Sequence, residues 1–134
     1  MKIAVIGSRE FKDKNLIFEI IRHTFQEQLI NKYSIEEPHI FISGGAKGVD
    51  NYSECCIDDW NERMINSEYK LHKKIIFKPN WNKYGKSAGF KRNKLIINEA
   101  DKVIAFWNGQ SKGTKHSIDL AIEKGIPIDI YIRN

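Results

Sequence analysis

The chain has 134 residues, 41% of them hydrophobic and 29% charged, which is typical of one folded globular domain and excludes a disordered chain. The formal net charge of +5 allows an anionic ligand, but the basic residues are dispersed, so nucleic acid is an unlikely partner on charge alone. No secretory leader precedes the first apolar run, and no run approaches the roughly 20 residues needed to cross a bilayer. We therefore expect a single cytoplasmic domain over residues 1–134 with no membrane partner.

Apolar segments of strand length alternate with segments of helical spacing along the chain. Strands are predicted at residues 2–7, 39–43, 72–78, 102–107 and 127–132. Helices are predicted at residues 15–33, 49–65, 87–99 and 114–124, with Ser87 capping the third and Gly125 ending the fourth in a left-handed conformation. Residues 80–86 are predicted to form a polar loop.

Strands that alternate with helices predict an α/β fold, a Rossmann-like, doubly wound parallel sheet with helices on both faces. For five strands the expected order is 3-2-1-4-5, which makes strands 1 and 4 neighbours. A ligand crevice is then expected where the carboxyl ends of these two strands meet. Three polar, glycine-containing loops converge there, at residues 7–9, 44–50 and 108–114.

The stretch from Ser43 to Asp50 reads Ser-Gly-Gly-Ala-Lys-Gly-Val-Asp and joins the second strand to the second helix. Its glycines allow a sharp turn, and a strand that turns into a helix directs free N–H groups and the positive helix end at one spot. We interpret the stretch as a phosphate cradle. The alternative is a plain β–α turn, which also uses glycine.

Other residues near the crevice have candidate roles in binding. The loop from Gly109 to Thr114 is a second candidate anion site, although the Thr114 hydroxyl could simply cap its helix. Arg9 follows the first strand and could clamp a phosphate, or it could be an ordinary surface arginine. Arg92 and Asn93 lie in the third predicted helix, either as ligand contacts or as part of an exposed basic face.

Trp81, Tyr84 and Trp107 flank the crevice and are candidates for stacking on a base, although such aromatic residues more often pack in a core. Asp50 either favours the first turn of its helix through the dipole or bonds a ribose hydroxyl. His116 is the histidine nearest to the candidate site. No Walker A motif, dinucleotide fingerprint or metal-ligand spacing is found, so no cofactor and no metal are expected.

The motifs together resemble the SLOG superfamily, named for the SMF/DprA and LOG proteins, and are most similar to its YspA-type branch. The resemblance rests on segments spread over nearly the whole chain: residues 6–9, 41–50, Pro79 with Trp81, residues 85–86, 88–89, 92–93, 100–107, Gly109 and residues 111–114. It implies a Rossmann-like sheet that binds a nucleotide or a nucleotide-derived ligand on these loops.

The resemblance also implies a homo-oligomer, a dimer or a tetramer. Members include LOG phosphoribohydrolases, sensors of nucleotide signals, and DprA proteins that bind single-stranded DNA. LOG enzymes carry glutamates soon after a glycine-threonine turn, where this chain has Lys115, His116 and Ser117. Since glycosidic cleavage needs such a carboxylate, we expect binding rather than catalysis.

Our leading hypothesis is a protein that senses or sequesters a phosphorylated nucleotide derivative, such as a cyclic ADP-ribose-type signal. One alternative is a phosphoribohydrolase-like N-glycosidase that uses Asp50 or His116. Another is a single-stranded DNA-binding module of the DprA kind, resting on the basic segment from Lys83 to Lys94. The predicted ligand-binding residues are Gly7, Ser8, Arg9, Ser43, Gly44, Gly45, Ala46, Lys47, Gly48, Asp50, Trp81, Arg92, Asn93, Trp107, Gly109, Ser111, Lys112, Gly113 and Thr114.

Overall fold

A computed structural model describes residues 1–26, 39–67 and 71–134 of the chain. Its five strands are β1 (Lys2–Gly7), β2 (Ile40–Ser43), β3 (Lys74–Ile76), β4 (Lys102–Trp107) and β5 (Ile128–Ile132). They form one parallel sheet in the order β3-β2-β1-β4-β5, which confirms the predicted topology. Gly7 of β1 pairs with Phe106 of β4, so these two strands end side by side.

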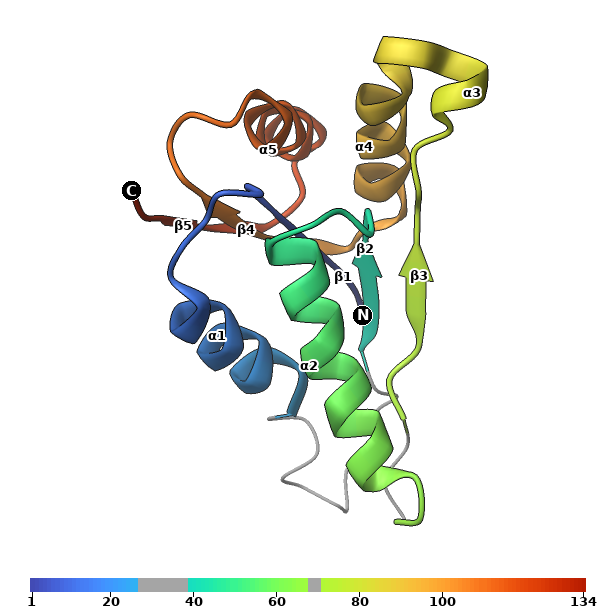
Figure 1. Ribbon diagram of the computed structural model, residues 1–134, viewed down its shortest axis with the longest axis vertical. Helices are drawn as coiled ribbons and strands as arrows, with labels where there is room; N and C mark the ends of the chain where they lie inside the picture. The colour runs from blue at the N-terminus through green and yellow to red at the C-terminus, as the bar shows by residue number, and fades with distance from the viewer. Residues whose placement is uncertain (27–38, 68–70) are drawn as a thin grey trace.

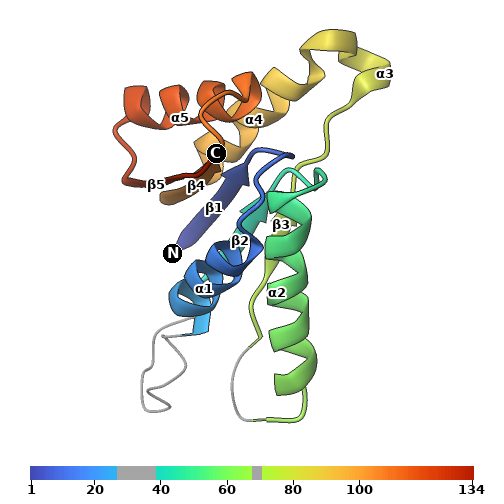
Figure 2. The ribbon, with the colours of Figure 1, turned by 60° about the vertical axis from the view of Figure 1, so that its left-hand side comes forward.

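The helices lie on both faces of the sheet, as predicted. They are α1 (Lys14–Gln26), α2 (Val49–Met64), α3 (Trp81–Tyr84), α4 (Ala88–Glu99) and α5 (Lys112–Lys124). Figures 1 and 2 show α1 and α2 on one side of the sheet and α4 and α5 on the other. The part of the first predicted helix beyond Gln26 lies outside the described residues.

The alternation of side chains along the strands divides the core into two layers. Ile3 and Val5 of β1 pack toward α1 and α2, whereas Ala4 and Ile6 pack toward α4 and α5. Since both faces are covered, the inner strands are apolar at nearly every position, which explains the continuous apolar runs in the sequence.

Residues 80–86 are not the polar loop that the sequence predicted. They contain α3 and the start of a 3-10 turn (Gly85–Ser87) that leads directly into α4. The Asn80 side chain caps α3 by accepting a hydrogen bond from the Lys83 N–H at 3.1 Å.

The predicted capping of α4 by the Ser87 side chain is also wrong. Ser87 has helical dihedral angles because the 3-10 turn runs into the helix. Its hydroxyl instead donates to the Tyr84 carbonyl at 2.8 Å. The left-handed Gly125 at the end of α5 is confirmed, with φ of 76°.

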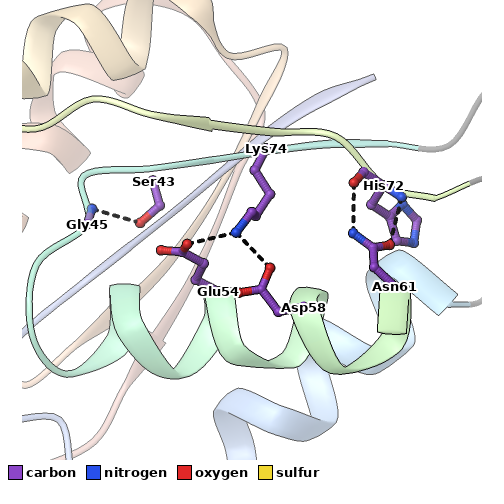
Figure 3. Close-up of polar contacts among 7 residues, drawn as sticks. All are labelled: Ser43, Gly45, Glu54, Asp58, Asn61, His72 and Lys74. Carbon is purple, nitrogen blue, oxygen red and sulfur yellow. Dashed lines mark hydrogen bonds and ion pairs between the residues drawn. The ribbon is translucent and has the colours of Figure 1, made fainter. Parts of the chain in front are cut away.

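Polar contacts fasten α2 to the edge of the sheet (Figure 3). The Asn61 side chain exchanges two hydrogen bonds of 2.9 Å with the backbone of His72, just before β3. Lys74 of β3 forms ion pairs with Glu54 and Asp58 of α2. No helix in the described part of the chain is long and apolar enough to cross a membrane.

Candidate functional site

A cavity of about 500 Å³ lies where the carboxyl ends of β1 and β4 meet. We call it the switch-point cavity, and its volume is in the range of small-molecule sites. Loops after β1, β2 and β4 and the facing sides of α4 and α5 form its wall. Its lining residues are Ile6, Gly7, Ser8, Arg9, Glu10, Ala46, Asp50, Arg92, Asn93, Ile96, Asn108, Gln110, Ser111, Gly113, Thr114 and Ser117.

A second hollow of about 360 Å³ adjoins this cavity, at the carboxyl ends of β2 and β3. We call it the basic groove. It is lined by Arg9, Gly44, Gly45, Ala46, Lys47, Lys78, Pro79, Trp81 and Arg92. Arg9, Ala46 and Arg92 line both hollows, so the two share a wall.

The groove is lined by cationic side chains and by no carboxylate, and the buried Asp50 beside it interacts with Arg92 alone among the four cations. Four of its lining residues are arginine or lysine, and none is aspartate or glutamate. Among the described residues, Arg9, Lys47 and Lys78 form no ion pair. Some lysines elsewhere in the chain do form ion pairs with carboxylates: Lys2, Lys74, Lys102 and Lys115. The groove is therefore a concentrated site for an anion.

Trp81 presents a large aromatic surface at the groove. It begins α3, and 53% of its surface is exposed. Gly89 of α4 lies behind it, where an added Cβ would come within 3.6 Å of the indole ring. An exposed indole beside unpaired cations is a suitable platform for stacking a planar ligand.

Arg92 reaches from α4 across the groove to the loop after β2. Its Nη1 donates to the Gly44 carbonyl at 2.8 Å. A Cβ added at Gly44 would lie 2.3 Å from that nitrogen, so this glycine is needed for the approach of the guanidinium. Burial lowers the pKa of Arg92, and the negative charge of Asp50 opposes that shift.

The loop predicted as a phosphate cradle uses several of its own groups internally. The Gly45 N–H donates to the Ser43 hydroxyl at 3.3 Å (Figure 3), and the Ala46 N–H donates to the Asp50 carboxylate at 3.1 Å. Gly48 has φ of 82°, and an added Cβ would lie 2.7 Å from the Arg9 carbonyl oxygen. The glycines of this stretch are therefore explained by close contacts within the protein as well as by the turn itself.

Asp50 is buried in the first turn of α2, with 7% of its surface exposed. Burial raises the pKa of Asp50 to about 6, against the opposing effects of the Ala46 N–H, the Arg92 charge and smaller contacts with Gly44 and Ser43. A buried carboxyl group with a raised pKa is found in catalytic sites and also in structural networks. The groups that act on the Asp50 carboxyl are those of its own loop and the Arg92 guanidinium.

A hydroxyl network closes the far wall of the switch-point cavity. The Ser8 hydroxyl lies 3.2 Å from Asn108 Oδ1 and 3.4 Å from the Thr114 hydroxyl. Ser111, rather than Thr114, is the N-cap of α5, and its hydroxyl accepts from the Thr114 N–H at 3.4 Å. The network holds the loops after β1 and β4 together.

Several predicted site residues lie outside both hollows. Ser43, Gly48, Trp107, Gly109 and Lys112 line neither of them. The Trp107 indole N–H instead donates to the Ser111 carbonyl at 3.1 Å, which supports the loop behind the cavity.

His116, the second catalytic candidate, also lines neither hollow. Its ring lies edge-on to Phe90, with centroids 4.6 Å apart. Burial lowers the pKa of His116.

Eight lining residues were not among the predicted ligand-binding residues: Ile6, Glu10, Lys78, Pro79, Ile96, Asn108, Gln110 and Ser117. Lys78 and Asn108 follow the ends of β3 and β4, so the rule that places ligands at the carboxyl ends of strands could have found them. Ser117 and Ile96 lie inside helices and carry no comparable signal.

Comparisons with known proteins give one relative and one solved structure. No model of a known protein family matches the chain. The Gene 61 protein of Mycobacterium phage D29 is 27% identical over 128 residues, which are 95% of this chain and 93% of that protein. DNA processing protein A (DprA) from Helicobacter pylori, which binds single-stranded DNA, matches with a TM-score of 0.66 and 20% sequence identity.

The structural match covers 100% of this chain and 66% of the Helicobacter pylori chain. It confirms the Rossmann-like fold, which the chain shares with this DprA protein. The YspA-type branch and the homo-oligomer are supported by neither comparison and stay predictions.

The comparison overturns the leading functional hypothesis. From the sequence we expected a sensor of a nucleotide-derived signal, with nucleic acid as an unlikely partner. Both expectations are wrong, because the solved protein that shares the whole fold of this chain is a single-stranded DNA-binding protein. The expectation from net charge was wrong because it considered the chain as a whole, whereas Arg9, Lys47, Lys78 and Arg92 line a single groove.

Proposed function

We propose that this chain binds single-stranded DNA along the basic groove, as a DprA-like module of the SLOG superfamily. The observation that carries the proposal is the groove itself, in which four cationic side chains and no carboxylate lie beside the exposed Trp81. Such a combination provides both of the interactions that single-stranded nucleic acids offer to proteins.

The cations suit the sugar–phosphate backbone. Arg9, Lys47 and Lys78 extend from the loops after β1, β2 and β3, so they follow the edge of the sheet rather than forming one compact point. Lys83 and Lys91 continue the positive surface, with their ammonium groups 5.1 and 4.5 Å from the centre of the Tyr84 ring. A row of this kind matches a chain of phosphates better than a single small anion.

Trp81 supplies the preference for single strands. Bases in a duplex are stacked on one another, whereas an unpaired base offers its face to an aromatic side chain. Each such stacking contact is worth about 1–3 kcal/mol. We therefore place an unpaired base on the Trp81 indole, with its neighbouring phosphates on Arg9 and Lys47.

One comparison supports the proposal, because the Helicobacter pylori protein with this fold binds single-stranded DNA.

Fluorescence anisotropy with a labelled oligothymidylate and with a hairpin duplex tests the proposal. We expect the single strand to bind more tightly, with log K falling linearly against log salt at about 0.7 per phosphate neutralised. Lys78→Ala should weaken binding and reduce that slope. Lys73→Ala is the matched control, because Lys73 is also exposed but lies at the amino end of β3, whereas Lys78 lies beyond its carboxyl end.

Absence of binding at low salt would overturn the proposal. So would an equal loss of affinity in the Lys73 and Lys78 variants, since binding would then follow net charge rather than the groove.

A further inference from the structure

Asn93 has a buried amide side chain that does not line the basic groove but is hydrogen-bonded to Arg92, which does. It lies in α4 with 8% of its surface exposed and lines the switch-point cavity but not the basic groove. Its Oδ1 accepts a hydrogen bond of 3.0 Å from Nε of Arg92. Its Nδ2 lies 3.4 Å from both the Gly113 carbonyl and Nδ1 of His116 on α5.

These contacts fix Arg92 from two sides. One N–H of the guanidinium is held by Asn93 and another by the Gly44 carbonyl. The plane of the guanidinium is therefore set before any ligand arrives, and its other N–H groups remain for the two hollows that Arg92 lines. An arginine held in this way loses less rotamer freedom on binding than one that projects into solvent.

We infer that Asn93 is a positioning residue for the binding of single-stranded DNA. It orients Arg92 toward a backbone phosphate at the junction of the two hollows. This inference rests on the proposed function. The amide suits the role because it accepts from Arg92 and donates to α5 at the same time. It thereby links the loop after β2, which holds Gly44, to the first turn of α5.

The inference predicts that the contribution of Arg92 depends on Asn93. The effect of Arg92→Ala on oligothymidylate binding is measured in four backgrounds: wild type, Asn93→Ala, Asn93→Asp and Asn98→Ala. Asn93→Asp keeps the acceptor for Nε. Asn98 is an exposed asparagine of the same helix whose contacts are with Lys124, so its variant is the matched control.

In wild type, Arg92→Ala should reduce affinity about tenfold, as expected for a charged hydrogen bond, and lower the salt slope by about 0.7. The same losses should appear in the Asn93→Asp and Asn98→Ala backgrounds. In Asn93→Ala, removing Arg92 should change affinity by less than about twofold and leave the slope unchanged, as coupling between contacting residues requires. If Asn93→Ala does not fold, Asn93→Ser replaces it, because its short hydroxyl also stops short of the guanidinium.

Two outcomes separate the inference from the proposed function. If wild type does not bind DNA, the proposed function fails and this inference fails with it. If wild type binds and Arg92→Ala costs the same in the Asn93→Ala or Asn93→Ser background, Asn93 is only structural and the inference alone is overturned. A purely structural role would lower the melting temperature without removing the dependence on Arg92.

Discussion

Gly44 and Gly48 are glycines because neighbouring arginines occupy the space that side chains would need. Gly44 faces the guanidinium of Arg92, and Gly48 faces the backbone of Arg9. Both arginines line the basic groove. These glycines therefore leave the space that Arg9 and Arg92 need in order to line the groove.

Replacing Gly48 with alanine tests this role. Its φ of 82° and ψ of −126° are rarely adopted by other residues, and the new Cβ would lie 2.7 Å from the Arg9 carbonyl oxygen. We expect a loss of about 1–3 kcal/mol in the free energy of unfolding, measured by urea denaturation. Gly89→Ala is the control, since that position is helical and has room for a Cβ, and it should be neutral or stabilising. Equal losses in both variants would contradict this explanation.

Asp50 is expected to reduce stability at neutral pH. Its pKa is about 6 in the folded protein, compared with a usual 3.8, because burial disfavours the ionised carboxylate. A group whose pKa is raised on folding favours the folded state at low pH, so stability falls as pH rises from about 4 to about 6 and stays low above that range. The rise corresponds to an upper bound of about 3 kcal/mol.

We expect Asp50→Asn to raise the free energy of unfolding by about 1–3 kcal/mol at pH 8, because asparagine carries no buried charge. The two proteins should converge in stability as the pH is lowered toward 4. Urea denaturation across this range measures the difference. A difference that does not vary with pH would show that the Asp50 charge is not the cause.

At the scale of elements, the contact between α2 and the start of β3 depends more on backbone hydrogen bonds than on ion pairs. Asn61→Ala removes two bonds to the His72 backbone and should cost about 1–3 kcal/mol. Lys74→Ala removes ion pairs that are partly exposed and should cost less than about 1 kcal/mol. Chemical denaturation of the two variants compares them, and a larger loss from Lys74→Ala would reverse this order.

The sequence predicted the sheet well because its strands are covered on both faces. The apolar run of β4 has the same bounds in the structure as in the prediction, residues 102–107. In contrast, α3 has only four residues and none of them is buried, so it leaves no periodic apolar pattern. Asn80 was the available signal, since asparagine is a preferred N-cap, but a short cap motif is indistinguishable from a turn in the sequence.

The structure has hollows near the crevice that the sequence predicted, but the hydrogen bonds and ion pairs around them were not predicted. The topology predicted that the loops after β1, β2 and β4 converge, and the switch-point cavity lies there, whereas the basic groove extends to the end of β3. Two backbone N–H groups of the loop are used in internal hydrogen bonds, from Gly45 to the Ser43 hydroxyl and from Ala46 to the Asp50 carboxylate. These bonds could not be predicted from the sequence, because they depend on the conformation of the folded loop. Ion pairing is likewise invisible in the sequence, so the unpaired groove cations did not stand out from the paired lysines.

At the scale of the whole molecule, the proposed function depends on which basic residues lie close to carboxylates and which do not. Lys74 lies within β3 and is paired with carboxylates of α2, whereas Lys78 lies two residues beyond that strand in the groove. The modest net charge of +5 thus conceals a local site with a large excess of positive charge.

Nuclear magnetic resonance of the ¹⁵N-labelled protein during titration with oligothymidylate tests the central claim most directly. We predict that the shifted signals will come from the basic groove, above all the Trp81 indole N–H and the amides of residues 44–47, while α1 and α2 beyond its first turn remain unchanged. The same titration with a duplex should produce weaker shifts at Trp81, because paired bases cannot stack on it. Shifts centred on α1 and α2, or no shifts at low salt, would contradict the assignment of the groove as a single-stranded DNA site.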